Sequence, residues 1–472
     1  MTIRTKIVAT LGPASSSIEV LRELSRAGCS VFRVNFSHGT QQQRAEFLRM
    51  VRQVEAESLS PLAVMADLCG PKIRVGPIAG GSVLLAEGRQ IVIQRDPIEG
   101  DADRISTTLG ELVDEVAPAQ PILLDDGKIR LEVVAPSPPD EVVCRVVAGG
   151  ILAGGKGVNL PGTSLRLSAL TQKDLRDAEW IARQDFDYVA MSFVRSAADV
   201  AALREILAAA GSGAQIVAKI ETPQALENIQ AITDAADAVM VARGDLGVEM
   251  NLAAVPVAQK TIARLCQSAG KPCIIATQML ESMTTSPTPT RAEVSDVANA
   301  VLDFADAVML SGETAVGKYP VEAVATMRDI VANIQDYADR SAAPPHVAYA
   351  PARTAAALAG AVREIIALEE IAAVAVFTIT GTTARMFAKN RVSCPILGIS
   401  PDKATVRRMC LYYGVVALQG RTVRHTREVL ALASRFALDK KLAKPGDKIV
   451  VVSGRPLATP GRTNTLVVHT IQ

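Results

Sequence analysis

The sequence has 472 residues, of which 49% are hydrophobic and 3% aromatic, and its formal net charge is +1. A chain of this length exceeds one ordinary hydrophobic core, so two to four domains are expected. The near-zero charge gives no electrostatic reason to expect a nucleic acid or an anionic membrane as a partner.

The cysteines and the N-terminal segment indicate the compartment. The seven cysteines form no Cys-x-x-Cys pair, which is typical of small buried residues in a reducing cytosol. The first residues lead directly into an apolar strand and contain no hydrophobic core of a signal peptide. No run of about 18 apolar residues is present, so no membrane span is expected. We therefore predict a soluble cytoplasmic protein.

The first 71 residues alternate apolar runs with amphipathic stretches. Strands are predicted at 7–10, 29–35 and 61–67. Between them, one helix begins after Ser17 and ends at Gly28, a common C-cap residue, and a second runs from about Gln41 to Glu57. This strand–helix–strand rhythm is typical of βαβ units.

Residues 72–167 interrupt this rhythm and predict an inserted unit. Short alternating strands are separated by turn dipeptides such as Asp126-Gly127 and Gly149-Gly150, a pattern typical of a small all-β fold. We predict a small β-barrel lid that is hinged at Pro71 and again near Gly162. For Asp126, a hairpin turn is the preferred interpretation.

The βα rhythm resumes after the insertion. Thr171 and Asp174 have the spacing of a capping box, and Thr290 with Glu293 forms another before an apolar stripe that includes Val294. Further strands are predicted at 188–193, 215–221, 238–243, 272–278 and 307–311. Three strands before the insertion and five after it give eight, the number that closes a (β/α)8 TIM barrel.

The last part of the chain predicts a separate unit. A segment rich in alanine and proline, 341–345, is a plausible linker, and strands and helices alternate after it. We expect a smaller open α/β domain there. The predicted domains are therefore the barrel in two parts, 1–71 and 168–340, the lid, 72–167, and the C-terminal domain, 341–472.

An unusual set of side chains lies at the C-terminal ends of the predicted barrel strands. It comprises Thr10, Arg33, Asn35, Asp67, Ser192, Lys219, Glu221, Asp245, Thr277, Ser311 and Glu313. Polar strand ends occur in any barrel because loops start there, but two carboxylates on neighbouring strands can share one Mg²⁺. Backbone N–H groups at Gly244 and Asp245, where a helix begins, can bind an anion. The rim favours metal-assisted chemistry on a phosphorylated or carboxylated small molecule.

At these residues the chain resembles the pyruvate kinase family. The matching segments follow the family's order and are Ala9–Ser15, Arg33–Gly39, Gly70–Arg74, Lys156–Gly162, Lys219–Glu221, Met240–Gly247, Ala276–Met283, Arg291–Asp303 and Met309–Thr314. The resemblance implies a barrel, an inserted lid and a C-terminal regulatory domain, commonly in a homotetramer. It also implies the last step of glycolysis, in which phosphoenolpyruvate and ADP give pyruvate and ATP.

The resemblance implies roles for the rim residues. Glu221 and Asp245 would hold Mg²⁺, for which Mn²⁺ can substitute, and the ion would offset charge on an enolate. Lys219 would face the transferring phosphoryl group and the enolate oxygen, where a fixed cation helps most in the transition state.

The remaining rim residues would bind substrate. Arg33 would hold the phosphate, for which its planar group suits better than lysine. Gly244 and Asp245 would bind substrate through their backbone. Thr277 would lie on the enolate face that is protonated, and because a hydroxyl is a weak acid we expect a relay through water.

The nucleotide would lie between barrel and lid. The positions expected to contact ADP or ATP are Thr10, Pro13, His38, Arg74 and Lys156. For His38, a role as a hydrogen-bonding residue within its own loop stays open as an alternative.

One departure from the family pattern concerns the monovalent cation. Many members need K⁺, held by positions that match Asn35, Ser37, Asp67 and the carbonyl of Leu68, with an acid where this chain has Lys72. An ammonium group can replace K⁺ by donating to carboxylate and carbonyl oxygens. Both cations side by side would repel by roughly 4 kcal/mol at about 4 Å and an effective dielectric near 20. We therefore predict that K⁺ is not required.

The C-terminal domain carries a candidate site for a phosphorylated allosteric effector, which the resemblance implies. Hydroxyls and a helix N-terminus can hold a phosphate, and ordinary helix capping is the alternative. The expected residues are Thr380, Thr382, Thr383, Ser453, Arg455 and Arg462.

Two other functions remain as alternatives. A Mg²⁺-dependent aldolase or lyase also stabilises a pyruvate enolate on a barrel, but it has no need of Arg33, Lys156 or a lid over a nucleotide. A non-catalytic scaffold has no need of Lys219, Glu221 and Asp245 together.

Overall fold

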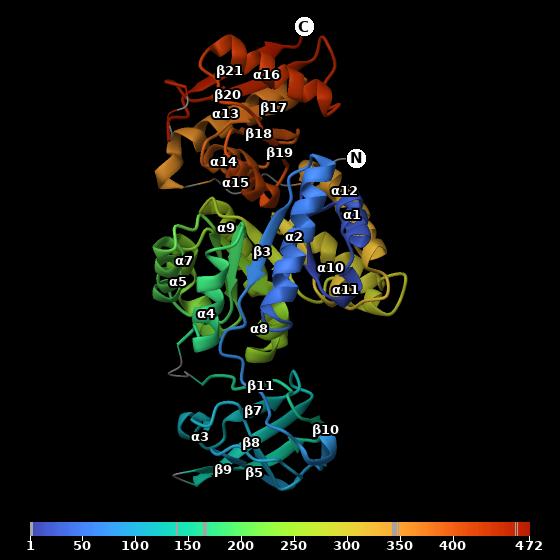
Figure 1. The fold of residues 1–472 in the computed structure, drawn as a ribbon, viewed down its shortest axis with the longest axis vertical. Coiled ribbons are helices and arrows are strands. Elements are labelled where there is room, and N and C mark those ends of the chain that lie inside the picture. Colours follow the sequence, from blue (N-terminus) through green and yellow to red (C-terminus); the bar gives the residue numbers. More distant parts are fainter. Residues whose placement is uncertain are drawn as a thin grey trace.

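The computed structural model describes residues 3–137, 140–163, 168–341, 347, 349–457, 459 and 461–472. Three units follow one another along the long axis, with the barrel in the middle, the inserted β domain at one end and the C-terminal domain at the other (Figure 1). Residues 342–345 of the predicted linker and residues 164–167 at the predicted end of the lid lie outside the described residues.

Eight parallel strands close the barrel in the described part of the chain, as predicted. They are β1 (Lys6–Leu11), β2 (Cys29–Asn35), β3 (Ala63–Asp67), β12 (Tyr188–Met191), β13 (Gln215–Ile220), β14 (Ala238–Ala242), β15 (Cys273–Ala276) and β16 (Ala307–Leu310). Around the barrel they run in the order β1-β16-β15-β14-β13-β12-β3-β2. Helices cover the outer faces of these strands, so each strand is buried on both faces. The strands are therefore nearly continuous apolar runs.

Many of the helices around the barrel begin at a Ser or Thr whose side chain caps them. The helices around the barrel are α1 (Ile18–Ala27), α2 (Gln41–Ser58), α4 (Gln172–Ile181), α5 (Ala197–Ala209), α6 (Pro223–Glu227), α7 (Ile229–Ala235), α8 (Arg243–Glu249), α9 (Val255–Ser268), α10 (Arg291–Leu302), α11 (Gly312–Ala315) and α12 (Pro320–Ser341), with the 3-10 turns η1 (Pro13–Ser15), η3 (Leu252–Ala254) and η4 (Glu281–Thr284). Both predicted capping boxes form, at Thr171 and Thr290. Val294, placed in the apolar stripe of α10, is instead 37% exposed, because Val297, Ala300 and Val301 form the buried face.

The inserted unit is built from short strands around one apolar core. Its elements are η2 (Ala79–Gly81), β4 (Ser82–Leu85), β5 (Gln90–Gln94), β6 (Arg104–Ser106), α3 (Leu112–Glu115), β7 (Pro121–Leu124), β8 (Ile129–Ser137), β9 (Glu141–Ala148), β10 (Gly150–Ala153) and β11 (Val158–Asn159). Six strands pair in the order β11-β7-β8-β9-β5-β6, and β10 pairs with β4.

The lid therefore consists of two sheets, where the sequence predicted one small barrel. Between the two sheets, the backbone at Gly149 passes so close to β4 that a Cβ there would lie 2.3 Å from the carbonyl oxygen of Leu85. After this close approach the chain leaves the larger sheet and pairs with β4. The hairpin turn predicted at Asp126 is present, with positive φ at both Asp125 and Asp126.

The C-terminal domain is the predicted open α/β unit. Its elements are η5 (Ala350–Ala352), α13 (Arg353–Leu368), β17 (Ile371–Phe377), α14 (Thr382–Lys389), β18 (Ile396–Ser400), α15 (Lys403–Arg408), η6 (Met409–Leu411), β19 (Val415–Gln419), α16 (Thr426–Asp439), β20 (Lys448–Ser453) and β21 (Thr465–Thr470). The sheet order is β19-β18-β17-β20-β21, and β21 is antiparallel to β20.

Buried ion pairs join this domain to the end of the barrel away from the lid (Figure 1). The Nζ atom of Lys389 lies 2.6 Å from Asp306, which directly precedes β16. Arg407 donates through Nε to both carboxylate oxygens of Glu55, at 2.8 and 2.9 Å. Removing one partner of such a buried pair leaves an uncompensated charge, so these contacts hold the two domains in a defined arrangement. In the part of the chain that the structure describes, none of the helices is long and apolar enough to cross a membrane.

Candidate active site

Lys219 lies at the centre of the barrel rim. Its Nζ atom is 2.6 Å from Ser192 Oγ, 2.9 Å from Glu221 Oε1 and 3.2 Å from Asp67 Oδ1. Burial disfavours the charged amine, but the carboxylates of Asp67 and Glu221 outweigh this effect and raise the pKa of Lys219 above its ordinary value. Lys219 is therefore a fixed cation at neutral pH. Ser192, which the sequence placed among the rim residues without a specific role, directly follows the neighbouring strand β12.

Arg33 lies beside this cluster on β2. Its Nε atom donates to Asp67 Oδ2 at 2.6 Å, and Nη1 donates to Thr10 Oγ1 at 3.1 Å. Burial would raise the pKa of Asp67, but Lys219 and Arg33 hold it below the ordinary value. Asp67 thus remains ionised and orients two cations toward the same rim.

Glu221 directly follows β13, and Asp245 lies in the first turn of α8, which follows the neighbouring strand β14. The backbone N–H of Phe193 donates to Glu221 Oε2 at 2.7 Å. Burial raises the pKa of Glu221, Lys219 opposes the rise, and the charge of Asp245 adds to it. A cation between the two carboxylates would relieve this repulsion.

This carboxylate pair fits the predicted Mg²⁺ ion. Among the described residues, no cluster of three or more His, Cys, Asp or Glu side chains could hold a metal. Mg²⁺ is commonly held by only one or two carboxylates and completes its octahedral shell with water and substrate oxygens. Glu221 and Asp245 therefore match Mg²⁺ better than a metal that needs a full protein ligand set.

Thr277 was predicted within a strand, but it lies just beyond β15 with φ +70°. A β-branched residue rarely adopts this conformation, which marks local strain. Its Oγ1 accepts a hydrogen bond from the Gly244 N–H at 2.7 Å and donates to the Ala276 carbonyl at 2.6 Å. Arg243 donates to the Thr277 carbonyl at 2.7 Å. The Gly244 N–H expected to bind substrate is thus engaged by Thr277 here.

The predicted monovalent-cation positions lie together at the ends of β2 and β3. Asn35 is in register with Asp67, its Oδ1 accepts from the Ser37 N–H at 2.9 Å, and the Leu68 carbonyl accepts from Ser192 at 2.7 Å.

Lys72 has a different partner from the one predicted. Its Nζ atom lies 3.5 Å from Asp245 Oδ1, so the ammonium pairs with a carboxylate of the candidate metal site. The attraction of opposite charges explains this position. Its role at the monovalent-cation positions stays a prediction.

The predicted nucleotide residues lie where lid and barrel face each other. Thr10 is buried and Pro13 is exposed. Arg74 donates to the Gly155 carbonyl at 3.0 Å, and Lys156 lies 2.9 Å from Asp125 Oδ1.

The pKa of His38 reflects the positive charge of this region. Burial lowers its pKa, and nearby cations lower it further; these cations are Arg74, Lys72, Arg33 and Arg44. Such a concentration of positive charge suits a phosphate ligand. Arg44 was not predicted, yet it donates to the carbonyls of Phe36, His38 and Gly39 and shapes their loop. An arginine in the first turn of α2 carries no sequence signal for this role.

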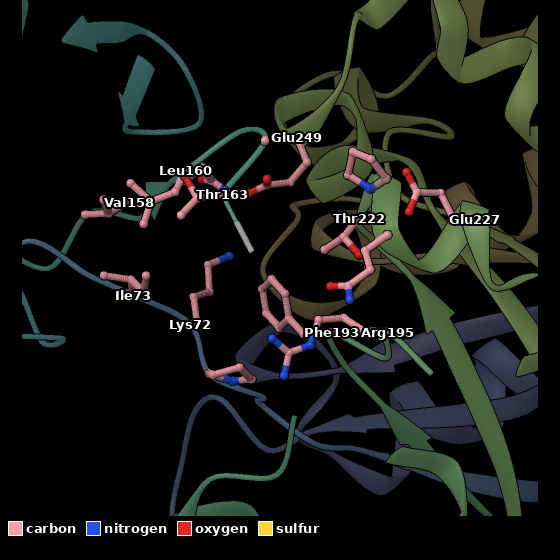
Figure 2. A pocket seen from close by; sticks show the side chains of 15 residues that line it. Lys72, Ile73, Val158, Leu160, Thr163, Phe193, Arg195, Thr222, Glu227 and Glu249 are labelled. Carbon is pink, nitrogen blue, oxygen red and sulfur yellow. Dashed lines mark hydrogen bonds between the residues drawn. The ribbon is translucent and has the colours of Figure 1, made fainter. Parts of the chain in front are cut away.

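A cavity of about 290 Å³ opens between lid and barrel. Figure 2 shows Val158 and Leu160 of the lid on one side and Phe193, Thr222 and Glu227 of the barrel on the other. The head of Lys72 points into the space between them. The residues of the barrel rim thus lie next to a cavity that the lid partly encloses.

A second cavity, of about 880 Å³, lies in the C-terminal domain. Five predicted effector residues line it, namely Thr380, Thr382, Thr383, Ser453 and Arg462. Arg455 is not among the lining residues; its Nη2 instead donates to Thr426 Oγ1 at 2.7 Å. Arg353 and Arg421, which were not predicted, add positive charge to the lining.

Comparison with known proteins agrees with this arrangement. Residues 2–324 match the family described as "Pyruvate kinase, barrel domain", and residues 356–469 match "Pyruvate kinase, alpha/beta domain". A pyruvate kinase of Agrobacterium vitis is 44% identical, with 98% of this chain and 96% of the relative covered. A pyruvate kinase of Mycobacterium tuberculosis is 41% identical, with 100% and 99% covered. The comparisons give the aldolase alternative no support. This chain belongs to the pyruvate kinase family.

Proposed function

We propose that the rim residues catalyse phosphoryl transfer from phosphoenolpyruvate to ADP, with Lys219 as the central catalytic residue. The observation that carries this assignment is the buried ammonium of Lys219 between Asp67 and Glu221. A cation held by two carboxylates in a site of low polarity stabilises developing negative charge without reorganisation. Family membership supports the reaction, and the geometry supports the roles of the individual residues.

In this reaction the bond between the enol oxygen and phosphorus breaks, and a bond forms between phosphorus and the terminal oxygen of ADP. Arg33 binds the phosphoryl oxygens, because the planar N–H donors of its guanidinium group match their geometry. Lys219 faces the enolate oxygen as its charge grows. Mg²⁺, when bound by Glu221 and Asp245, supplies a Lewis acid for these oxygens.

The enolate then takes a proton on its methylene carbon to give pyruvate. Thr277 is proposed to direct this proton, because its hydroxyl is held by Gly244 and Ala276 at the end of β15. The hydroxyl is too weak an acid to supply the proton alone, so it orders a water that delivers it. Serine in its place would preserve this role, whereas valine would remove it.

We place the nucleotide between lid and barrel. The cations around His38 support this position, and Lys156, which is paired with Asp125, lies on the segment that returns from the lid to the barrel. We further propose that Lys72 replaces K⁺ at Asn35, Ser37, Asp67 and Leu68, so that the enzyme does not require K⁺. The absence of the usual acid at position 72 supports this proposal.

Three broader features complete the proposal. The cavity lined by Thr382 and Thr383 binds a phosphorylated effector, which its arginines and hydroxyls favour. The chain assembles as a homotetramer, as is common in the family. It acts in the cytoplasm, and its seven free cysteines agree with a reducing compartment.

A coupled assay of pyruvate formation tests the function. Purified enzyme with Mg²⁺, phosphoenolpyruvate and ADP should release pyruvate and ATP in equal amounts. Lys219→Met should abolish most of this activity, and Lys448→Met, on β20 far from the rim, should not change it. Equal rates for Lys219→Met and the parent, or pyruvate release that does not need ADP, would contradict the assignment.

A further inference from the structure

The two chain segments that connect lid and barrel are paired with each other. The Val75 N–H donates to the Lys156 carbonyl at 2.8 Å, and the Val158 N–H donates to the Ile73 carbonyl at 3.0 Å. An antiparallel bridge joins Arg74 to Gly157 between these bonds. We call residues 72–75 and 155–159 the connector ribbon. Because its two segments are hydrogen-bonded, they move together, and fixing one of them fixes the other.

The ribbon contacts the barrel through its outward-facing side chains. Val158 and Leu160 are buried in the lid core, 4% exposed each. Successive side chains of a strand point to opposite faces, so Asn159 between them faces the barrel. Its Nδ2 donates to Glu249 Oε1 at 2.8 Å. This bond joins the returning segment of the lid to α8.

Helix α8 also carries the contact of the outgoing segment. Asp245 and Glu249 are four residues apart, so they lie on one face of the helix. Lys72 reaches Asp245 at 3.5 Å, and Asn159 reaches Glu249 at 2.8 Å. Both segments of the ribbon therefore dock on the helix that bears a proposed metal ligand.

The two contacts differ in strength. Lys72 and Asp245 are 31% and 29% exposed, so solvent screens their attraction. Asn159 is 9% exposed, and Glu249 lines the cavity between lid and barrel (Figure 2). A short hydrogen bond from a buried amide to a carboxylate is stronger than an exposed pair. The hydrogen bond between Asn159 and Glu249 also does not involve Asp245, which would bind Mg²⁺.

We propose that the hydrogen bond between Asn159 and Glu249, here called the lid latch, sets the position of the lid over the barrel. Glu249 is then a positioning residue, which acts on the nucleotide through Asn159 and the connector ribbon. The proposal rests on the proposed function in one respect, namely that ADP lies between lid and barrel. Its structural part, the docking of the ribbon on α8, is independent of catalysis.

Reversing the polarity of the latch tests it. Asn159→Asp places a second carboxylate against Glu249 and removes the donor, so the ribbon should leave α8. In Asn159→Asp/Glu249→Gln, the glutamine amide can donate to the new aspartate and restore the bond. Asn333→Asp, an exposed residue of α12, is the matched control for the introduced charge.

Two measurements read out the result. For Asn159→Asp we expect the KM for ADP to rise about tenfold, the size expected for losing one hydrogen bond to a charged acceptor. The KM for phosphoenolpyruvate should change less than about twofold, because Arg33 and Lys219 are untouched. Hydrogen exchange of the Val75 and Val158 amides, measured without substrates or metal, should become faster, because a ribbon that is no longer held against α8 opens its own hydrogen bonds more often. The double variant should restore both quantities, and Asn333→Asp should change neither.

The outcomes separate the two proposals. An unchanged exchange rate and KM for ADP in Asn159→Asp, or failure of Glu249→Gln to restore them, overturns the latch. If the parent forms no pyruvate, the proposed function fails, while the exchange comparison of the three proteins still decides whether the latch holds the ribbon.

Discussion

Replacing Lys72 by glutamate should convert the enzyme from K⁺-independent to K⁺-activated. The change restores the acid that K⁺-dependent members of the family carry at this position and removes the ammonium that we propose as the substitute cation. The positions that match the K⁺ site, Asn35 and Asp67, are in register on adjacent strands and stay in place. The variant therefore reverses the charge at position 72 and leaves the other positions of the K⁺ site unchanged.

The structure sets the size of the expected effect. Separating the Lys72 ammonium from Asp245 costs no more than about 1 kcal/mol, because solvent strongly screens an ion pair that is this exposed. At the cation site, an ammonium about 4 Å from K⁺ would repel it by roughly 4 kcal/mol, about a thousandfold in K⁺ affinity. Lys72→Glu removes this repulsion and adds an attraction of similar size, so K⁺ should bind the variant far better than the parent.

The assay is pyruvate formation at constant ionic strength, with K⁺ replaced stepwise by tetramethylammonium. The parent should vary less than about twofold across the series. Without K⁺, Lys72→Glu should lose about a hundredfold or more of its rate, since the rim then lacks one of its charges, and K⁺ should restore most of it. Lys72→Met should be slow without K⁺ and weakly activated. Strong K⁺ activation of the parent, or equal K⁺ responses of parent and Lys72→Glu, would refute the reasoning.

Three further changes have defined outcomes. Lys219→Met should lower kcat by about 10²–10³ in steady-state assays, because the charge opposite the enolate oxygen is lost; a loss below tenfold would exclude a central role. Lys6 is buried and donates to the Val415 carbonyl at 2.7 Å, and burial lowers its pKa to about 8. The parent should therefore gain up to roughly 3 kcal/mol of stability as pH rises from about 8 to 10.4, whereas Lys6→Met should lack this gain and have the higher melting temperature at pH 7. Phosphorylated metabolites should shift the melting temperature of the parent selectively, and Thr382→Ala/Thr383→Ala should remove the shift; no selective shift in the parent would disprove the effector site.

The sequence predicted the barrel correctly because its signals are local. Each strand is an apolar run, many of the helices begin at a Ser or Thr cap, and alternation of the two favours a parallel sheet. The ends of the strands were placed less accurately. Phe193, Thr277 and Gln278 continue apolar or polar patterns in the sequence, but all three have positive φ. Residues of these types rarely adopt that conformation, so their sequence gives no warning of it.

Contacts between distant segments were harder to predict than the residues that make them. The proposed catalytic set could be named from the sequence because Lys219 lies near the end of the buried strand β13, Glu221 directly follows it and Asp245 follows β14. The lid latch joins residues 90 positions apart, and neither Asn159 nor Glu249 differs from an ordinary polar surface residue in the sequence. The position of the Lys72 ammonium likewise depends on two competing carboxylates, Asp67 and Asp245. Their distances from Lys72 are set by the fold and cannot be read from the sequence.

A lysine on the lid connector and a free ion supply the same charge in different ways. A free K⁺ binds according to its concentration. Lys72 is part of the connector ribbon, whose two segments are hydrogen-bonded to each other, so its ammonium reaches the rim only in a position that the docked ribbon allows. In our proposal the lid latch fixes that position through Asn159. If Lys72 replaces the ion as proposed, the charge at the rim is coupled to the connector of the lid.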